Sequence, residues 1–154
     1  TSGTLADGIF ASDSILFIQE SVLPIDGTVA SDPGSGFADA TGVTITVPAA
    51  DVNECSKLIV TMSGQMRIDK ATHAYGGVRI TRTAPSTVNG ATMHLGVVSG
   101  GTEVYNCFVP MMVDESLSNA DHTYKLEYSG LSATYSSTMY PRNGQTVITV
   151  LGVK

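Results

Sequence analysis

The chain has 154 residues, a hydrophobic share of 42%, a charged share of 14% and a formal net charge of −6. This length fits one domain with a core of its own. Eight scattered basic residues and a negative net charge argue against a nucleic-acid-binding protein, which needs clustered Lys and Arg. No apolar run approaches the length of a membrane span.

The low charge content bears on the surface of the protein, since ordinary soluble proteins are roughly 25% charged. Extensive burial of surface in an assembly would explain the deficit. A surface rich in Ser and Thr is the alternative explanation, because hydroxyl groups hydrate well without charge.

The N-terminal part of the chain is expected to lead from an arm into the first strand. Residues 1–8 are small and polar and are predicted to form the arm, and residues 9–154 to form a single domain. The segment 9–20 contains the run Ile15, Leu16, Phe17, Ile18, which is apolar on both faces of a strand. Turn signals such as Asp26-Gly27 then predict a loop over residues 24–42.

Four segments in the middle of the chain alternate apolar and polar residues, as half-buried strands do. Gly64 interrupts one of them, which indicates a bulge or a close approach. Residues 49–56 are expected to form one helical turn. The predicted inward-facing rows are Val43, Ile45 and Val47; Leu58, Val60, Met62, Met66 and Ile68; Val78 and Ile80; and Met93, Leu95 and Val97.

The C-terminal third continues the strand pattern. Residues 102–113 are mostly apolar, and Pro110 predicts that this strand is bulged or lies at a sheet edge. Residues 122–128 place His122, Tyr124, Leu126 and Tyr128 on one face, and residues 131–140 read as a solvent-side strand rich in Ser, Thr and Tyr. The whole pattern predicts an all-β fold, an antiparallel β-sandwich or jelly roll of about eight to nine short strands.

The last strand, predicted over Thr146–Val153, is apolar on both faces. A sandwich covers only one face of a strand with its own core, so we expect the other face to meet a second copy of the chain. The run at residues 15–18 has the same character and is the natural neighbour of this strand. The predicted subunit interface therefore consists of Ile15, Leu16, Phe17, Ile18, Val147, Ile148, Val150 and Leu151.

Motifs that carry chemistry are absent from the sequence. There is no phosphate-binding loop, dinucleotide fingerprint, nucleophile elbow or His-Glu-X-X-His zinc motif, so we expect neither an enzyme nor a cofactor. A hydrolytic grouping of a histidine (His73, His94 or His122) with a Ser or Cys107 stays open, but His94 is expected at the surface. Cys55 and Cys107 are expected to be free thiols, with Cys107 buried.

Two further groups could serve binding. Asp26, Asp32 and Asp39 share the predicted loop and could bind Ca²⁺, although solvated loop carboxylates are commoner. Tyr135 and Tyr140 could contact a partner or stack on a sugar, whereas Tyr124 and Tyr128 are expected to pack inside the sheet.

The segment H-T-Y-K-L-E-Y from His122, the Ser/Thr-rich strand after it and the final T-V-I-T-V-L-G-V resemble the end of jelly-roll domains in bacteriophage structural proteins. These domains include capsid decoration (cement) proteins and tail-fibre heads, and they are similar to the trimeric tumour-necrosis-factor/C1q fold. The resemblance implies a homotrimer with residues 15–18 and 147–151 near the threefold axis.

The function expected from this resemblance is structural. It implies a virion protein, made in the host cytoplasm, that reinforces a phage head by binding the major capsid protein or other virion proteins. A tail-fibre head or lectin-like module that binds a host glycan is the alternative. A secreted C1q-like signalling domain is disfavoured, because the sequence has neither an Asn-X-Ser/Thr acceptor nor the features of a signal peptide.

Overall fold

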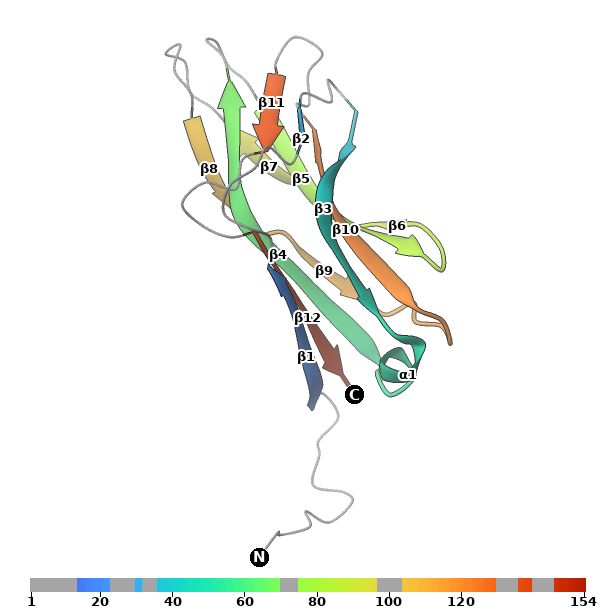
Figure 1. Ribbon diagram of the computed structural model, residues 1–154. Helices are drawn as coiled ribbons and strands as arrows, with labels where there is room; N and C mark the ends of the chain where they lie inside the picture. Colours follow the sequence, from blue (N-terminus) through green and yellow to red (C-terminus); the bar gives the residue numbers. More distant parts are fainter. Residues whose placement is uncertain are drawn as a thin grey trace, which may run out of the picture.

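The computed structural model describes residues 14–22, 30–31, 36–69, 75–96, 104–129, 136–139 and 146–154. These residues form twelve strands and a short helix (Figure 1). The elements are β1 (Ile15–Val22), β2 (Ala30–Ser31), β3 (Ala38–Val47), α1 (Ala49–Val52), β4 (Lys57–Asp69), β5 (Tyr75–Ala84), β6 (Val88–Asn89), β7 (Met93–Gly96), β8 (Val104–Phe108), β9 (Met111–Asp114), β10 (His122–Ser129), β11 (Ser136–Met139) and β12 (Val147–Val153).

Two antiparallel sheets pack face to face, which confirms the predicted β-sandwich (Figure 1). The five-stranded sheet contains β3, β10, β5, β6 and β7, and the seven-stranded sheet contains the other strands. The long strand β4 organises the seven-stranded sheet. Its first half lies between β12 and β9, its second half between β11 and β8, and β1 pairs with the far side of β12.

The core lies between the sheets and is built from the alternating rows that the sequence predicts. On β4, Leu58, Val60 and Met62 are fully buried, and the residues between them face outward. The rows of β3, β5 and β10 are buried in the same way, including Tyr124 and Tyr128. Side chains of Met66 and Ile68, and all of Val97, lie outside the described residues.

The close approach predicted at Gly64 is present. A Cβ atom built there would lie 2.8 Å from the Phe108 ring and 2.9 Å from Thr146 Oγ1. Proline acts as predicted in the segment 102–113, where β8 ends before Val109 and β9 begins after Pro110. Both strands pair only with β4 among the described strands, so they lie at the sheet edge.

Some predictions about the elements were wrong. Strand β3 begins at Ala38, inside the predicted loop, because β10 extends far enough to pair with Ala38 and Asp39. Gly42, with φ of 81°, lies where this pairing shifts register between Lys125 and Glu127. There are more strands than expected because short pairings such as β2 with β11 carry no alternation for a sequence pattern to reveal.

Two side chains that were predicted to be buried are exposed. Met93 was expected in the core but is 37% exposed, since β7 is an edge strand that pairs only with β5 among the described strands. Cys107 was expected to be buried but is exposed on β8, where the Gln65 side chain donates a hydrogen bond to its sulfur at 3.6 Å. Within the described part of the chain, no helix is long and apolar enough to cross a membrane.

Candidate assembly surface

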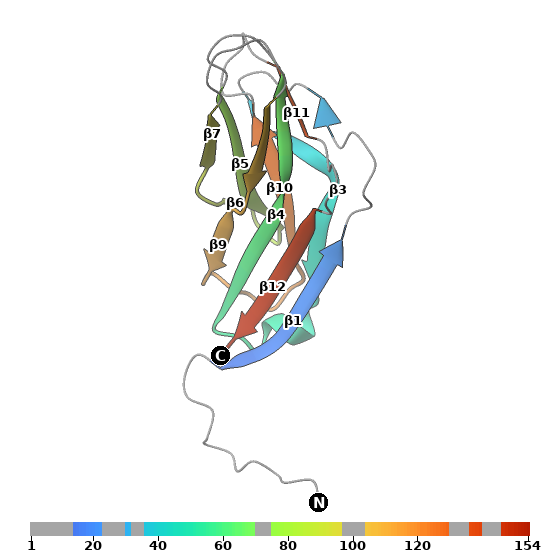
Figure 2. The same ribbon diagram turned by 90° about the vertical axis from the view of Figure 1, so that its left-hand side faces the viewer.

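An apolar row crosses the outer face of the seven-stranded sheet, the face turned away from the core. The strand registers place Ile18 beside Leu151, Leu151 beside Ile59, and Ile59 beside Val113. Figure 2 shows the four strands that carry them, β1, β12, β4 and β9, side by side. Because outward residues alternate with core residues on each strand, the row is continuous over the full width of this half of the sheet.

The most exposed apolar side chains lie at the two ends of this row. We call Ile15, Leu16, Ile18 and Val22 the β1 edge; these residues are 38–65% exposed. We call Val109, Met111 and Val113, which are 47–60% exposed, the β9 edge. Of the eight exposed large apolar side chains among the described residues, only Met93 lies elsewhere. Such clustering typically marks an interaction surface.

The structure divides the predicted interface residues between the outer face and the core. Ile148 and Val150 are 1% and 0% exposed and belong to the core of their own chain, so the prediction that they meet a second copy was wrong. The reason is the strand's alternation, which turns both toward the opposite sheet. Phe17 also packs on the core, with its ring directly over Gly152.

The other predicted interface residues do lie on the outer face. Ile18 is paired with Leu151, and Val22 with Val147, so Val147 and Leu151 share the surface with the β1 edge. Their role between subunits stays a prediction. The β9 edge and Ile59 were missed, although every second residue from Val109 to Val113 is apolar in a segment that was already predicted to lie at an edge.

The outer face of the five-stranded sheet is charged. Glu127 accepts hydrogen bonds at 2.7 Å from both Arg79 Nε and Thr81 Oγ1, and Lys125 forms ion pairs with Glu127 and Asp39. The Arg79 guanidinium also lies 4.0 Å from the centre of the Phe37 ring. The two outer faces of the sandwich therefore differ, because one carries a network of ion pairs and the other carries the apolar row.

The pKa values of this charged group follow from its pairing. Burial alone would raise the pKa of Glu127, but hydrogen bonds from Thr81, Arg79 and Lys125 outweigh it and hold the pKa below its ordinary value. The hydrogen bond to Asp39 raises the pKa of Lys125. Asp39 is thus engaged with an ammonium group, and Asp26 and Asp32 lie outside the described residues, as do Tyr135 and Tyr140. No group of three possible metal ligands occurs in the described part of the chain.

A buried polar cluster joins the two sheets. Asp114, at the end of β9, accepts hydrogen bonds at 2.7 Å from Arg82 on β5 and from the hydroxyl of Tyr124 on β10. Arg82, Asp114, His122 and Tyr124 are each at most 2% exposed. Burial alone would raise the pKa of Asp114, but the hydrogen bonds from Tyr124 and Ser116 and the charge of Arg82 together lower it.

Polar groups surround both ring nitrogens of His122. The backbone N–H of Ser118 donates to Nε2 at 3.3 Å. Nδ1 lies 3.5 Å from Asp114 Oδ2, 3.5 Å from Arg82 Nη1 and 3.4 Å from the Tyr124 hydroxyl oxygen. The cluster was missed by sequence reasoning, although Arg82 continues the inward row of Val78 and Ile80 and so gave a signal.

Ser118, His122 and Asp114 follow one another in space as the serine, histidine and aspartate of an acyl-transfer triad do. Ser118 Oγ lies 3.4 Å from His122 Nε2. Two features oppose that chemistry. Arg82 already neutralises Asp114, so a histidine cation beside them would be uncompensated. The backbone N–H of Ser118 also occupies the lone pair that would have to accept the serine proton. We therefore interpret the cluster as a structural link that ties β9 to the opposite sheet.

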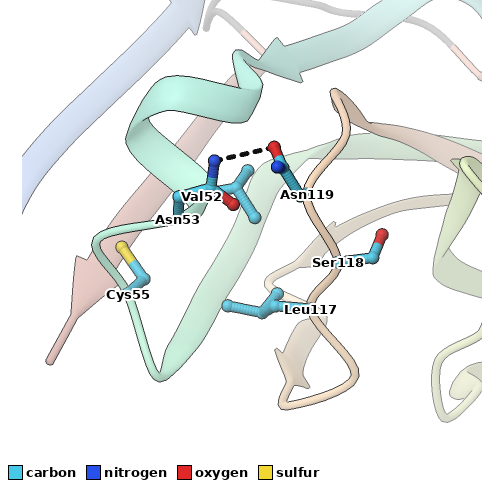
Figure 3. Close-up of a pocket in the computed structure, with 6 residues that line it drawn as sticks. All are labelled: Val52, Asn53, Cys55, Leu117, Ser118 and Asn119. Carbon is cyan, nitrogen blue, oxygen red and sulfur yellow. Dashed lines mark hydrogen bonds between the residues drawn. The ribbon is translucent and has the colours of Figure 1, made fainter.

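A small cavity of about 210 Å³ lies between α1 and the connection after β9. Figure 3 shows its lining, including the hydrogen bond of 2.8 Å from Asn53 to Asn119 and the side chains of Cys55 and Leu117. The Cys55 thiol donates to the Asp51 carbonyl, and burial raises the pKa of the thiol, so it is a poor nucleophile at neutral pH.

No protein-family model and no curated protein matches this chain. Among solved structures, the chain is similar to a chain in the structure of infectious bursal disease virus Gx strain. The identity is 9% and the TM-score 0.45, and the match covers 97% of this chain and 34% of the viral chain. It is similar to the VP2 subviral particle of the same virus, with 12% identity and a TM-score of 0.45, covering 100% and 42%. It is also similar to a chain in the structure of T=1 particles derived from that virus. The identity is 11% and the TM-score 0.45, and the match covers 100% of this chain and 41% of the viral chain.

The chain thus spans between about a third and two fifths of the length of these viral proteins. Likenesses at such identities and TM-scores leave the function to be argued from the residues of the chain itself.

Proposed function

We propose that the chain is a structural protein of a virion that associates with copies of itself through the outer face of β1, β12, β4 and β9. The apolar row Ile18, Leu151, Ile59 and Val113 is the observation that carries the proposal. In a lone subunit the ends of this row would remain in water. The resemblance of residues 122–154 to bacteriophage jelly-roll domains supports the virion part of the proposal.

The size of the surface supports a contact between proteins. At about 25 cal/mol per Å², full burial of an aliphatic side chain corresponds to roughly 60–120 Å², so the exposed parts of the two edges amount to roughly 200–450 Å². The largest apolar patch on a typical monomeric protein measures about 300–600 Å² and is often functional, so this surface has the size of a functional patch. The half-buried Leu151, Ile59 and Val147 add to it, and the charged face on the other side of the sandwich is suited to water.

In its full form, the proposal is a homotrimeric decoration (cement) protein that reinforces a phage head. Trimer association would cover the apolar face, and other surfaces would bind the major capsid protein. Purified particles of the source virus, studied by mass spectrometry and cryo-EM, test this. We expect trimeric density for this chain on the head; particles without the chain on the head would contradict it.

The proposal includes no catalytic activity and no cofactor. The pairing of Asp114 with Arg82 and the backbone N–H of Ser118 on His122 argue against serine hydrolysis, for the reasons given above. A serine-directed fluorophosphonate probe tests it directly, with labelling compared between the protein and its Ser118→Ala variant. We expect no labelling of either protein; labelling that Ser118→Ala abolishes would contradict the proposal.

A glycan-binding module, such as a tail-fibre head, is the second candidate. A cavity of about 360 Å³ beside the bulge of β3 is lined by Asp39, Thr44, Thr83 and Lys125 among others, and such groups hydrogen-bond to sugar hydroxyls. A glycan array with the Thr83→Val variant as control distinguishes the candidates. Binding that this variant weakens would favour the module, whereas a decoration protein should bind no glycan.

A further inference from the structure

We infer that the β1 edge of one copy contacts the β9 edge of the next copy. Made twice by each copy, this contact would cover both edges. This inference rests on the proposed self-association and adds which two surfaces meet. The occupant of each edge is thus a second copy of the chain.

The placement of the two edges is the first argument. They lie on opposite sides of a four-strand surface, since β12 and β4 separate β1 from β9. A two-fold axis through β1 would place β1 against β1 and leave the β9 edge bare. A two-fold axis between β12 and β4 would instead place each β1 edge on the β9 edge of the partner. Either that contact or a head-to-tail contact that closes into a ring covers both edges, and both place β1 against β9.

Charge is the second argument. Glu20 projects from β1 on the same face as Ile18 and Val22 and is exposed. A two-fold contact between β1 edges would bring two Glu20 carboxylates together, in a chain that already carries a net charge of −6. The outward side chains of the β9 edge are uncharged, so contact between unlike edges avoids this repulsion.

The two edges are also similar in extent. Exposed fractions are 38–65% on the β1 edge and 47–60% on the β9 edge, and both consist of aliphatic or thioether side chains. Each edge can therefore cover the other without leaving a large uncovered remainder. Methionine at position 111 adapts its shape readily to an opposing surface.

Disulfide trapping tests the inference. In a background with Cys55→Ser and Cys107→Ser, Ile18→Cys and Val113→Cys are made as separate proteins, oxidised alone, and oxidised after mixing and subunit exchange. We expect a linked pair only in the mixture. A link within one subunit cannot form, because three strand spacings separate the positions by about 14 Å and a disulfide needs Cα atoms within about 7 Å.

Four further variants complete the design. With both cysteines in one chain, the ladder of linked products should end at the number of subunits in the closed assembly, which is two for a two-fold dimer and three or more for a ring. Thr83→Cys, exposed on the charged face, is the matched control and should not link to Val113→Cys. Val22→Cys with Met111→Cys is a second pair from the same two edges, for use if either first variant fails to fold.

The outcomes separate the two proposals. Efficient linking of Ile18→Cys alone would indicate contact of β1 with β1, which overturns the inference and leaves self-association intact. An oligomeric mass with no disulfide between the β1 and β9 edges, in both the Ile18/Val113 and the Val22/Met111 cysteine pairs, would also overturn the inference and leave self-association intact. A monomeric mass for the unmodified protein would overturn the proposed self-association and, with it, this inference.

Discussion

Replacing Gly152 by alanine should lower the free energy of unfolding by about 1–3 kcal/mol, the usual cost of overpacking. Gly152 lies beside Phe17 in the pairing of β12 with β1. A Cβ atom built on Gly152 would lie 2.6 Å from Cδ1 and 2.7 Å from Cζ of the Phe17 ring. Carbon atoms normally approach to about 3.5–4.0 Å, so the ring would have to leave its place against the core.

Urea unfolding followed by circular dichroism, at one fixed protein concentration, measures the effect. Gly36→Ala is the matched control, because a Cβ atom there meets nothing within 4 Å, and its stability should change by less than about 1 kcal/mol. A double-mutant cycle with Phe17→Leu identifies the cause. The cost of Gly152→Ala should shrink when the ring is absent; an equal cost with and without the ring would refute the reasoning.

Three other predictions concern the buried cluster and the assembly surface. Asp114→Asn should cost about 3–5 kcal/mol, because it leaves the buried Arg82 without its carboxylate, whereas the exposed neighbour Glu115→Gln should be near neutral in the same urea assay. Since the pKa of Asp114 is lowered by folding, its contribution to stability is complete above the ordinary pKa of an aspartate and lost as pH falls through the lowered value. Acid unfolding of Asp114→Asn should thus depend less on pH in this range than that of the unmodified protein, and an equal dependence would contradict the assignment. Ile18→Lys should weaken self-association at least about tenfold, or about 1.4 kcal/mol, in sedimentation velocity, while Thr83→Lys on the charged face should not.

The sequence predicted the sandwich well because its strongest signal, period-two alternation, is set by burial on one face of each strand. Leu58, Val60 and Met62 illustrate this, since each lies in the predicted inner row and is fully buried. Alternation gives no signal in a strand whose two faces are both apolar or both polar. It could not show that β3 begins at Ala38, because that end of the strand is held by pairing with β10 and carries no pattern of its own.

The assembly surface was predicted only in part, for the same physical reason. A strand that is apolar on both sides does not reveal which side its own chain will cover. Ile148 and Val150 were therefore assigned to an interface although they fill the core. The contribution of β9 depends on β4 bringing it into line with β1 and β12, a long-range pairing that local sequence does not encode.

The buried cluster shows another limit. Each of its members occupies an inward position that alternation predicts, yet a charged residue in such a row is uninterpretable until its partner is known. Arg82 and Asp114 are brought together only when β9 packs across from β5 and β10. Pairing across the sandwich thus determines whether an inward charge is tolerated.

The solution mass of the unmodified protein tests the central claim most directly. Multi-angle light scattering over a dilution series at neutral pH is the measurement. The proposed trimer, in which copies cover the apolar row of the outer face, predicts a mass about three times the 16.0 kDa of the chain, maintained on dilution. A mass of one chain throughout the series would contradict the claim, because the β1 and β9 edges would then remain exposed to water.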